Sequence, residues 1–112
     1  MATYDIGGMF VPRARQLENP MLADKMLSRS ISRVELEAVL ADNEVIEVYE
    51  HDDRVRYVLL GRAGGRPLHI VVAEDDVVDA TVVLSVYEPG LAHGWDPATG
   101  YRTRREGDLG GR

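Results

Sequence analysis

The chain has 112 residues, a formal net charge of −6 and no cysteine. This length fits one domain, and the missing cysteines exclude disulfides, iron–sulfur clusters and cysteine-ligated zinc. Because phosphate neutralisation needs clustered Lys and Arg, the acidic balance argues against a protein that binds nucleic acid over a broad surface. No apolar run approaches the roughly 18 residues of a membrane span. The N-terminus also lacks the basic-then-apolar order of a signal peptide, so we expect a soluble cytoplasmic protein without membrane contact.

The first part of the chain predicts an extension followed by a short helix. Residues 1–18 show no sustained periodicity and contain Gly7-Gly8, so we interpret them as an N-terminal extension that orders only against the body or a partner. Asn19 and Pro20 then suit the N-cap and first position of a helix, because proline lacks only an N–H that would be unpaired there.

The sequence pattern for a second helix is stronger than that for the first. In "ISRVELEAVL", Ser32 and Glu35 have the spacing of a capping box, in which each residue satisfies a free N–H of the other. Apolar residues follow at helical spacing, and Asp42-Asn43 supplies the end. The two helices therefore form an N-terminal pair.

After residue 43, the spacing of apolar residues changes from the helical period to an alternation of every second residue. β-rich runs follow at residues 44–50, 54–61, 67–74 and 80–88. The first two connections are short enough for hairpins, so neighbouring strands should run antiparallel. We predict an α+β fold in which the helical pair packs on one face of a four-stranded antiparallel meander. The single domain spans 19–106, and 107–112 form a flexible tail.

Alternation within the strands predicts which side chains share a face. Under the helices we expect Leu68, Ile70 and Val72 from the third run, and Val82, Leu84 and Val86 from the fourth. In the predicted register the opposite face collects Arg56, His69, Ser85 and Tyr87. Residues 89–100 are a loop by their Gly and Pro content, with Trp95 as its anchor.

The order and spacing of several segments resemble the domain-of-unknown-function family 4258 over roughly residues 20–105. The segments are "ISRVELEAVL", "NEVIEVYE", "GRPLHIVVA", "SVYEP" and the terminal "YRTRR". This resemblance implies a fold akin to RelE-like toxins and to barnase-like and colicin-like ribonucleases. Family members look like toxin halves of toxin–antitoxin pairs. The resemblance thus implies metal-independent RNA cleavage without a cofactor, and an antitoxin-like protein partner.

The resemblance also suggests site residues. His69 matches the histidine of the third strand, and Tyr87 matches the tyrosine that ends the fourth. The family's terminal aromatic-and-arginine cluster corresponds to Trp95, Tyr101, Arg102 and Arg105. Many relatives carry a histidine at the start of the first helix and an arginine one turn later. This chain has Met21 and Lys25 at those places.

Metal-free RNA cleavage needs a base for the 2′-OH proton, cationic donors for the phosphate and an acid for the leaving 5′-oxygen. His69 suits the base or the acid, because the ordinary pKa of histidine is near 6.5. Arg102 and Arg105 can hold phosphate with forked donors. Tyr87 and Tyr101 can donate a hydrogen bond or stack on a base.

Other readings stay open. A non-enzymatic relative of the same fold, whose terminal patch docks a protein partner, is favoured by Met21, Lys25 and the acidic charge. Surface roles suffice for His51 and His93, which fall in turn and loop segments. The acidic turn "EDDVVD" offers oxygen ligands but lacks the glycine and final glutamate of an EF-hand. An open sheet leaves edge strands, which is compatible with a homo-oligomer.

Overall fold

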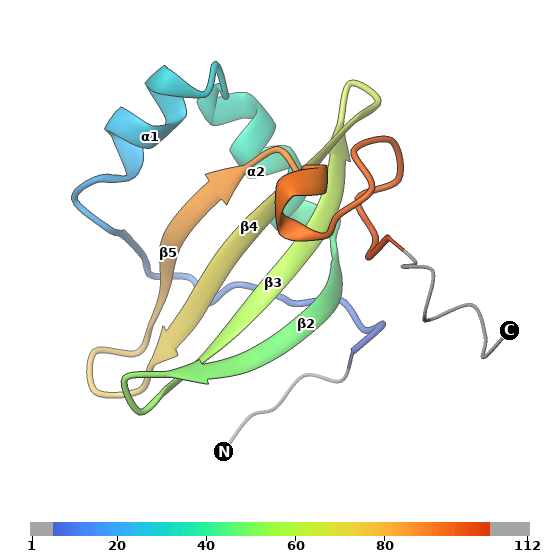
Figure 1. The fold of residues 1–112 in the computed structure, drawn as a ribbon. Coiled ribbons are helices and arrows are strands. Elements are labelled where there is room, and N and C mark those ends of the chain that lie inside the picture. The colour runs from blue at the N-terminus through green and yellow to red at the C-terminus, as the bar shows by residue number, and fades with distance from the viewer. Residues whose placement is uncertain (1–5, 104–112) are drawn as a thin grey trace, which may run out of the picture.

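The computed structural model describes residues 6–103, which form a sheet with helices on one face (Figure 1). In chain order the elements are β1 (Gln16–Glu18), α1 (Leu22–Ser28), α2 (Arg33–Ala41), β2 (Glu44–His51), β3 (Arg54–Ala63), β4 (Arg66–Asp75), β5 (Ala80–Tyr87) and the 3₁₀ turn η1 (Leu91–His93). The predicted α+β class is therefore confirmed. The predicted tail at 107–112 lies outside the described residues.

The sheet differs from the predicted meander in having a fifth strand. Its order is β1-β5-β4-β3-β2, and β2 to β5 pair antiparallel as predicted. β1 pairs in parallel with β5, through Leu17 opposite Val82. The sheet is therefore five-stranded and mixed, and the predicted four antiparallel strands are only part of it. β1 has only three residues, which are too few to establish a period in the sequence.

Both helices predicted from the sequence are present, but α1 begins two residues later than predicted. Ser32 Oγ accepts the Glu35 N–H at 3.1 Å, and Glu35 Oε1 accepts the Ser32 N–H at 2.9 Å, so the predicted capping box of α2 is confirmed. Helix α1 begins at Leu22 rather than at Pro20. The Asn19 side chain accepts a backbone N–H two residues later, at 2.8 Å, and this turn precedes the first helical residue.

The strand faces follow the predicted alternation except in β5. The buried set of β4 is Leu68, Ile70 and Val72, as predicted. The ladder between β4 and β5 contains a bulge, which brings Val83 rather than Val82 opposite Val72. Val83 therefore joins the core, and the predicted inward orientation of Val82 and Leu84 is wrong. An extra residue in one strand shifts the alternation of the strand residues beyond it, and periodicity alone does not show where it lies.

The N-terminal segment, residues 6–18, crosses the helix-covered face of the sheet from β2 to β5 (Figure 1). Its backbone pairs with Val45 of β2 at 2.7 Å. The Phe10 ring is fully buried and its centre lies 5.4 Å from that of Tyr57. The Asn43 side chain accepts the Phe10 N–H and donates to the Phe10 carbonyl, at 3.0 Å each. This segment thus contributes to the core through Phe10.

Candidate functional site

An open cleft of about 760 Å³ lies on the sheet face opposite the helices. Most of its lining comes from strands of the sheet and from residues 89–103, here called the C-terminal strap. The strap follows β5 and lies beside the sheet (Figure 1). The lining residues are Arg29, Glu47, Tyr49, Val58, Ser85, Tyr87, Glu88, His93, Trp95 and Arg102. Cations, carboxylates, an imidazole and three aromatic rings therefore face one concave surface.

The C-terminal strap folds back on itself and packs on the sheet through Trp95. Gly94 and Gly100 both have φ of +84°, where glycine is strongly favoured, and they allow the two reversals. Trp95 and Arg102, which lie on either side of the second reversal, form an antiparallel bridge. The Trp95 ring is 5% exposed, so its predicted role as the anchor of the loop is confirmed.

His69 lies beneath the strap rather than in the cleft. Its side chain is fully buried, 4.5 Å from the Trp95 ring and 5.3 Å from the Tyr87 ring between centres. Its Nε2 atom is 2.8 Å from the Gly100 carbonyl oxygen. Burial lowers the pKa of His69. A carbonyl can only accept, so Nε2 carries the proton of a neutral ring. Its predicted catalytic role stays a prediction.

The structure separates the two predicted tyrosines. Tyr87 lines the cleft, and burial raises its pKa to about 12, so its phenol keeps its proton at neutral pH and can donate a hydrogen bond. Tyr101 is exposed and donates to Glu44 in a separate depression of the surface. The hydrogen bond to Glu44 raises the pKa of Tyr101. Only Tyr87 therefore joins the cleft.

Arg102 is the most highly connected cation of the cleft. Its guanidinium carbon lies 3.9 Å from the centre of the Trp95 ring. Its Nη1 donates to the His93 carbonyl at 3.0 Å, and its Nη2 donates to Glu47 Oε1 at 2.9 Å. Arg102 thus ties the strap to β2. Arg105, the other arginine of the prediction, lies outside the described residues.

Three cleft residues with useful chemistry were not among the site residues that the sequence predicted. Arg29, at the C-cap of α1, donates to the Val86 carbonyl at 2.8 Å, and no carboxylate among residues 6–103 lies within ion-pair distance of it. Glu47 follows a bulge in β2. His93 ends η1 and is exposed. Strand alternation could have placed Glu47 beside Tyr49, but the position of Arg29 depends on how α1 packs.

The two places where the family's histidine and arginine are missing do not line the cleft. Met21 precedes α1 and is 56% exposed, and Lys25 lies in the last turn of that helix. Helix α1 contributes to the cleft through Arg29 instead. The cation that α1 supplies therefore comes from its end rather than from its first turn.

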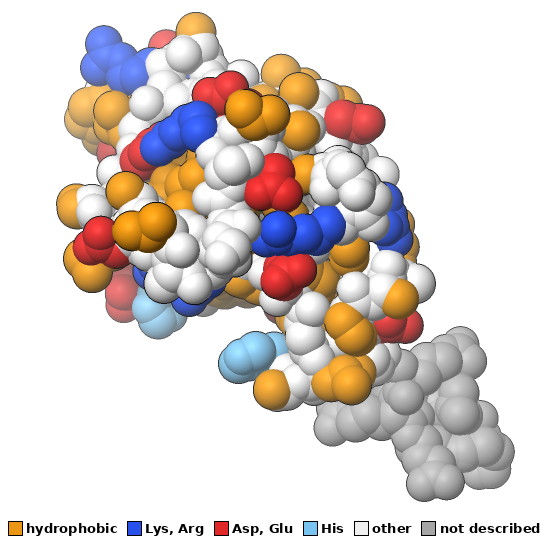
Figure 2. Space-filling model, turned by 90° about the horizontal axis from the view of Figure 1, so that it is seen from above, with side chains coloured by type: hydrophobic (Ala, Val, Ile, Leu, Met, Phe, Trp, Pro, Cys, Tyr) orange, Lys and Arg blue, Asp and Glu red, His pale blue; other side chains and the backbone are white. Residues whose placement is uncertain are grey.

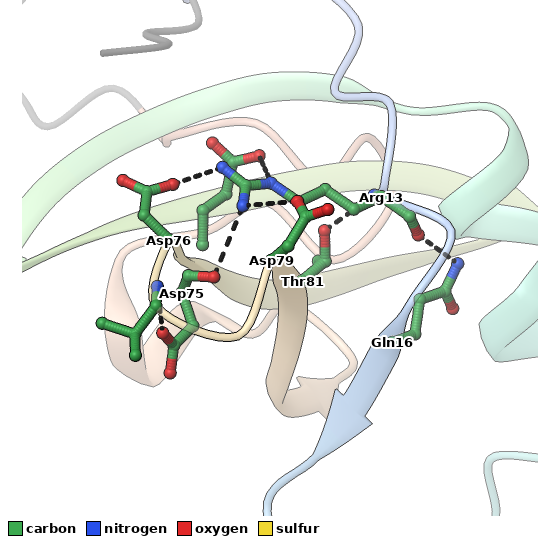
Figure 3. A network of polar contacts seen from close by, with 8 residues as sticks. Arg13, Gln16, Asp75, Asp76, Asp79 and Thr81 are labelled. Carbon is green, nitrogen blue, oxygen red and sulfur yellow. Dashed lines mark hydrogen bonds and ion pairs between the residues drawn. The ribbon is translucent and has the colours of Figure 1, made fainter.

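The acidic turn after β4 is occupied by a cation of the protein itself (Figure 3). Arg13 donates to Glu74 at 3.3 Å, to Asp79 at 3.0 Å and to Asp76. The carboxylate of Asp76, and after it that of Glu74, raises the pKa of Arg13. The turn thus fastens the N-terminal segment to the sheet. Within residues 6–103, no group of three or more His, Asp or Glu side chains is arranged to hold a metal ion.

The molecular surface has no broad basic area on the face seen from above. Lys and Arg side chains there are scattered among Asp and Glu side chains, with apolar side chains between them (Figure 2). Such a mixed surface gives little long-range attraction for a polyanion. On this face, nucleic acid would therefore have to be recognised by individual groups rather than by a basic surface.

The fold and the cleft define a small α+β domain with a polar, aromatic-lined site on its open sheet face. The family model described as "Domain of unknown function (DUF4258)" matches residues 22–88, more than half of the chain, so the chain belongs to this family. No curated protein and no solved structure gives a significant match. None of the helices within residues 6–103 is long and apolar enough to cross a membrane.

Proposed function

We propose that the protein is a RelE-like, toxin-related ribonuclease that cleaves RNA in the cleft without a metal ion. The observation that carries the proposal is the combination of three side chains in one cleft: the carboxylate of Glu47, the exposed imidazole of His93 and the guanidinium of Arg29, which has no carboxylate partner among the described residues. These are the base, the acid and the phosphate donor that this chemistry needs.

The reaction is an attack of a ribose 2′-oxygen on the adjacent phosphorus. Glu47 takes the 2′-OH proton as the new O–P bond forms, and protonated His93 gives a proton to the 5′-oxygen as its bond to phosphorus breaks. Arg29 donates to the phosphate oxygens, on which negative charge builds. The products are a 2′,3′-cyclic phosphate and a 5′-hydroxyl.

Other cleft residues hold this arrangement and receive the bases. Arg102 contacts both Glu47 and the His93 carbonyl, so it orients the base relative to the acid. Tyr49 and Tyr87 present aromatic rings on which unpaired bases can stack. In this account, buried His69 supports the site rather than reacting.

The proposal is tested with purified protein and a pool of varied RNA sequences in the presence of EDTA. Wild type is expected to cut the pool. Arg29→Ala is expected to cut about 100- to 1,000-fold more slowly, the usual effect of removing one oxyanion donor. Arg54→Ala, which changes an exposed arginine outside the cleft, is the matched control. Equal rates for Arg29→Ala and wild type would contradict the role of Arg29.

A second candidate function is a protein-interaction module, with an antitoxin-like partner. It is favoured by the outer strand β2, which exposes Val48 and Tyr49 beside the carboxylates of Glu44, Glu47 and Glu50. A basic, extended segment of a partner would pair with such an edge.

Binding to the product of the neighbouring gene tests this candidate. Glu50→Arg is expected to weaken a β2-directed complex at least about tenfold, because it places a like charge against a basic segment. Glu37→Arg, on α2, is the control for an equal change in net charge. Equal affinities of the wild type and Glu50→Arg for that product would show that β2 is not the docking edge.

A further inference from the structure

His69 lies where the strap meets the sheet, and it contacts the strap at two residues. Its Nε2 is 2.8 Å from the Gly100 carbonyl, and its ring stands edge-on, at 88°, to the Trp95 ring. It also makes an edge contact with the Tyr87 ring of β5. One buried side chain therefore joins both arms of the folded strap to the central strand β4.

The protonation state of this ring is set by its two nitrogens. Nε2 must donate, because its partner is a carbonyl oxygen. Nδ1 is buried and has no hydrogen-bond partner among residues 6–103. A neutral ring leaves only an unused lone pair at Nδ1, whereas a protonated ring would bury a second N–H without an acceptor.

Contacts beyond His69 lead from this ring to the reacting groups of the proposed site. Trp95 supports the Arg102 guanidinium at 3.9 Å, and Arg102 in turn holds Glu47 Oε1 at 2.9 Å. His69 does not line the cleft, and it contacts the cleft-lining rings of Trp95 and Tyr87 from beneath. The contacts that lead from His69 to Glu47 pass through Trp95 and Arg102 of the strap, so a movement of the strap changes how Glu47 is held.

We propose that neutral His69 is a positioning residue that holds the strap closed on the sheet, so that Arg102 orients Glu47, and that protonation of His69 releases the strap. This inference rests on the proposed function for its catalytic consequence, but the closing of the strap does not depend on that function.

The charges around His69 set the direction of the pH dependence. Burial lowers the pKa of His69 and outweighs the Gly100 carbonyl of the strap and Glu47 of β2, which both raise it. Arg102 of the strap also lowers it, and Tyr87 of β5 stays neutral at these pH values. The released state, in which the ring is solvated, binds a proton more readily. The closed state is therefore fully favoured above about pH 6.5 and is lost as pH falls below that value.

Trp95 reports the strap directly, because it is the single tryptophan of the chain. In wild type, acidification from pH 7.5 to 4.5 is expected to shift the Trp95 emission maximum to longer wavelength while far-ultraviolet circular dichroism stays constant. His69→Gln keeps a neutral N–H donor for Gly100 and is expected to abolish this shift. His51→Gln, at the exposed end of β2, is the control and is expected to follow wild type.

The outcomes separate this inference from the proposed function. If the emission of wild type does not shift in this range, or if His69→Gln shifts as wild type does, the positioning role is overturned. If the shifts are as expected and neither wild type nor His69→Gln cuts RNA at any pH, the strap is held by His69 but the proposed function fails. If His69 holds the strap and the cleft also cleaves RNA, the cleavage rate of wild type falls between pH 6.5 and 5 more steeply than the cleavage rate of His69→Gln.

Discussion

Phe10→Ala is expected to lower the free energy of unfolding by about 3–5 kcal/mol, the usual cost of truncating a fully buried aromatic side chain. Phe10 is completely buried and packs against Tyr57, and its backbone N–H and carbonyl are both hydrogen-bonded to the Asn43 side chain. Removing its ring leaves a cavity between the N-terminal segment and the sheet. The loss is a large part of the roughly 5–15 kcal/mol that stabilises a typical domain. Urea denaturation followed by circular dichroism measures it.

Met9→Ala is the matched control, because Met9 is the neighbouring apolar residue and is 47% exposed. Its effect is expected to stay within about 0.5 kcal/mol, as for most surface substitutions. If Phe10→Ala is no more destabilising than Met9→Ala, the N-terminal segment contributes nothing to the core.

Glu47→Gln is expected to slow RNA cleavage by about 100- to 10,000-fold, the contribution of a well-placed general base. Glutamine has nearly the shape of glutamate and can still accept a hydrogen bond from Arg102, so the strap stays in place, but it cannot take the 2′-OH proton. The initial rate of cleavage of a fluorescent RNA measures this loss, and Trp95 emission checks that the strap is unchanged.

Glu50→Gln provides the control on the same strand. Glu50 pairs with Val55, three residues beyond Glu47, on the opposite face of β2 from the cleft. Its cleavage rate should equal that of wild type. If Glu47→Gln also cleaves at the wild-type rate, another group takes the proton and the assignment of the base is wrong.

Local signals in the sequence predicted local structure well. The capping box between Ser32 and Glu35 needs only the residues that form it, so the start of α2 followed from the sequence. The bulge in β5 and the pairing of β1 depend on partners far along the chain, and neither leaves a periodic trace. The burial of Phe10 likewise depends on Asn43, 33 residues later.

In the candidate site, too, local patterns were predicted from the sequence and long-range contacts were not. Alternation placed His69 and Tyr87 on the sheet face opposite the core, and the structure confirms that they lie side by side there. Alternation could not show that the strap covers His69, because Gly100 reaches it only after two chain reversals. Arg29 was missed for a similar reason, since the packing of α1 decides which of its residues reaches the cleft.

Cleavage of RNA through the ribose 2′-hydroxyl is tested with two substrates in EDTA: an RNA that wild type cuts at one position, and the same RNA with a 2′-deoxy sugar at that position. The first is expected to give 2′,3′-cyclic phosphate and 5′-hydroxyl ends, and the second is expected to stay intact there. Cleavage of the deoxy substrate at the same position, or no cleavage of any RNA, would overturn the proposed function.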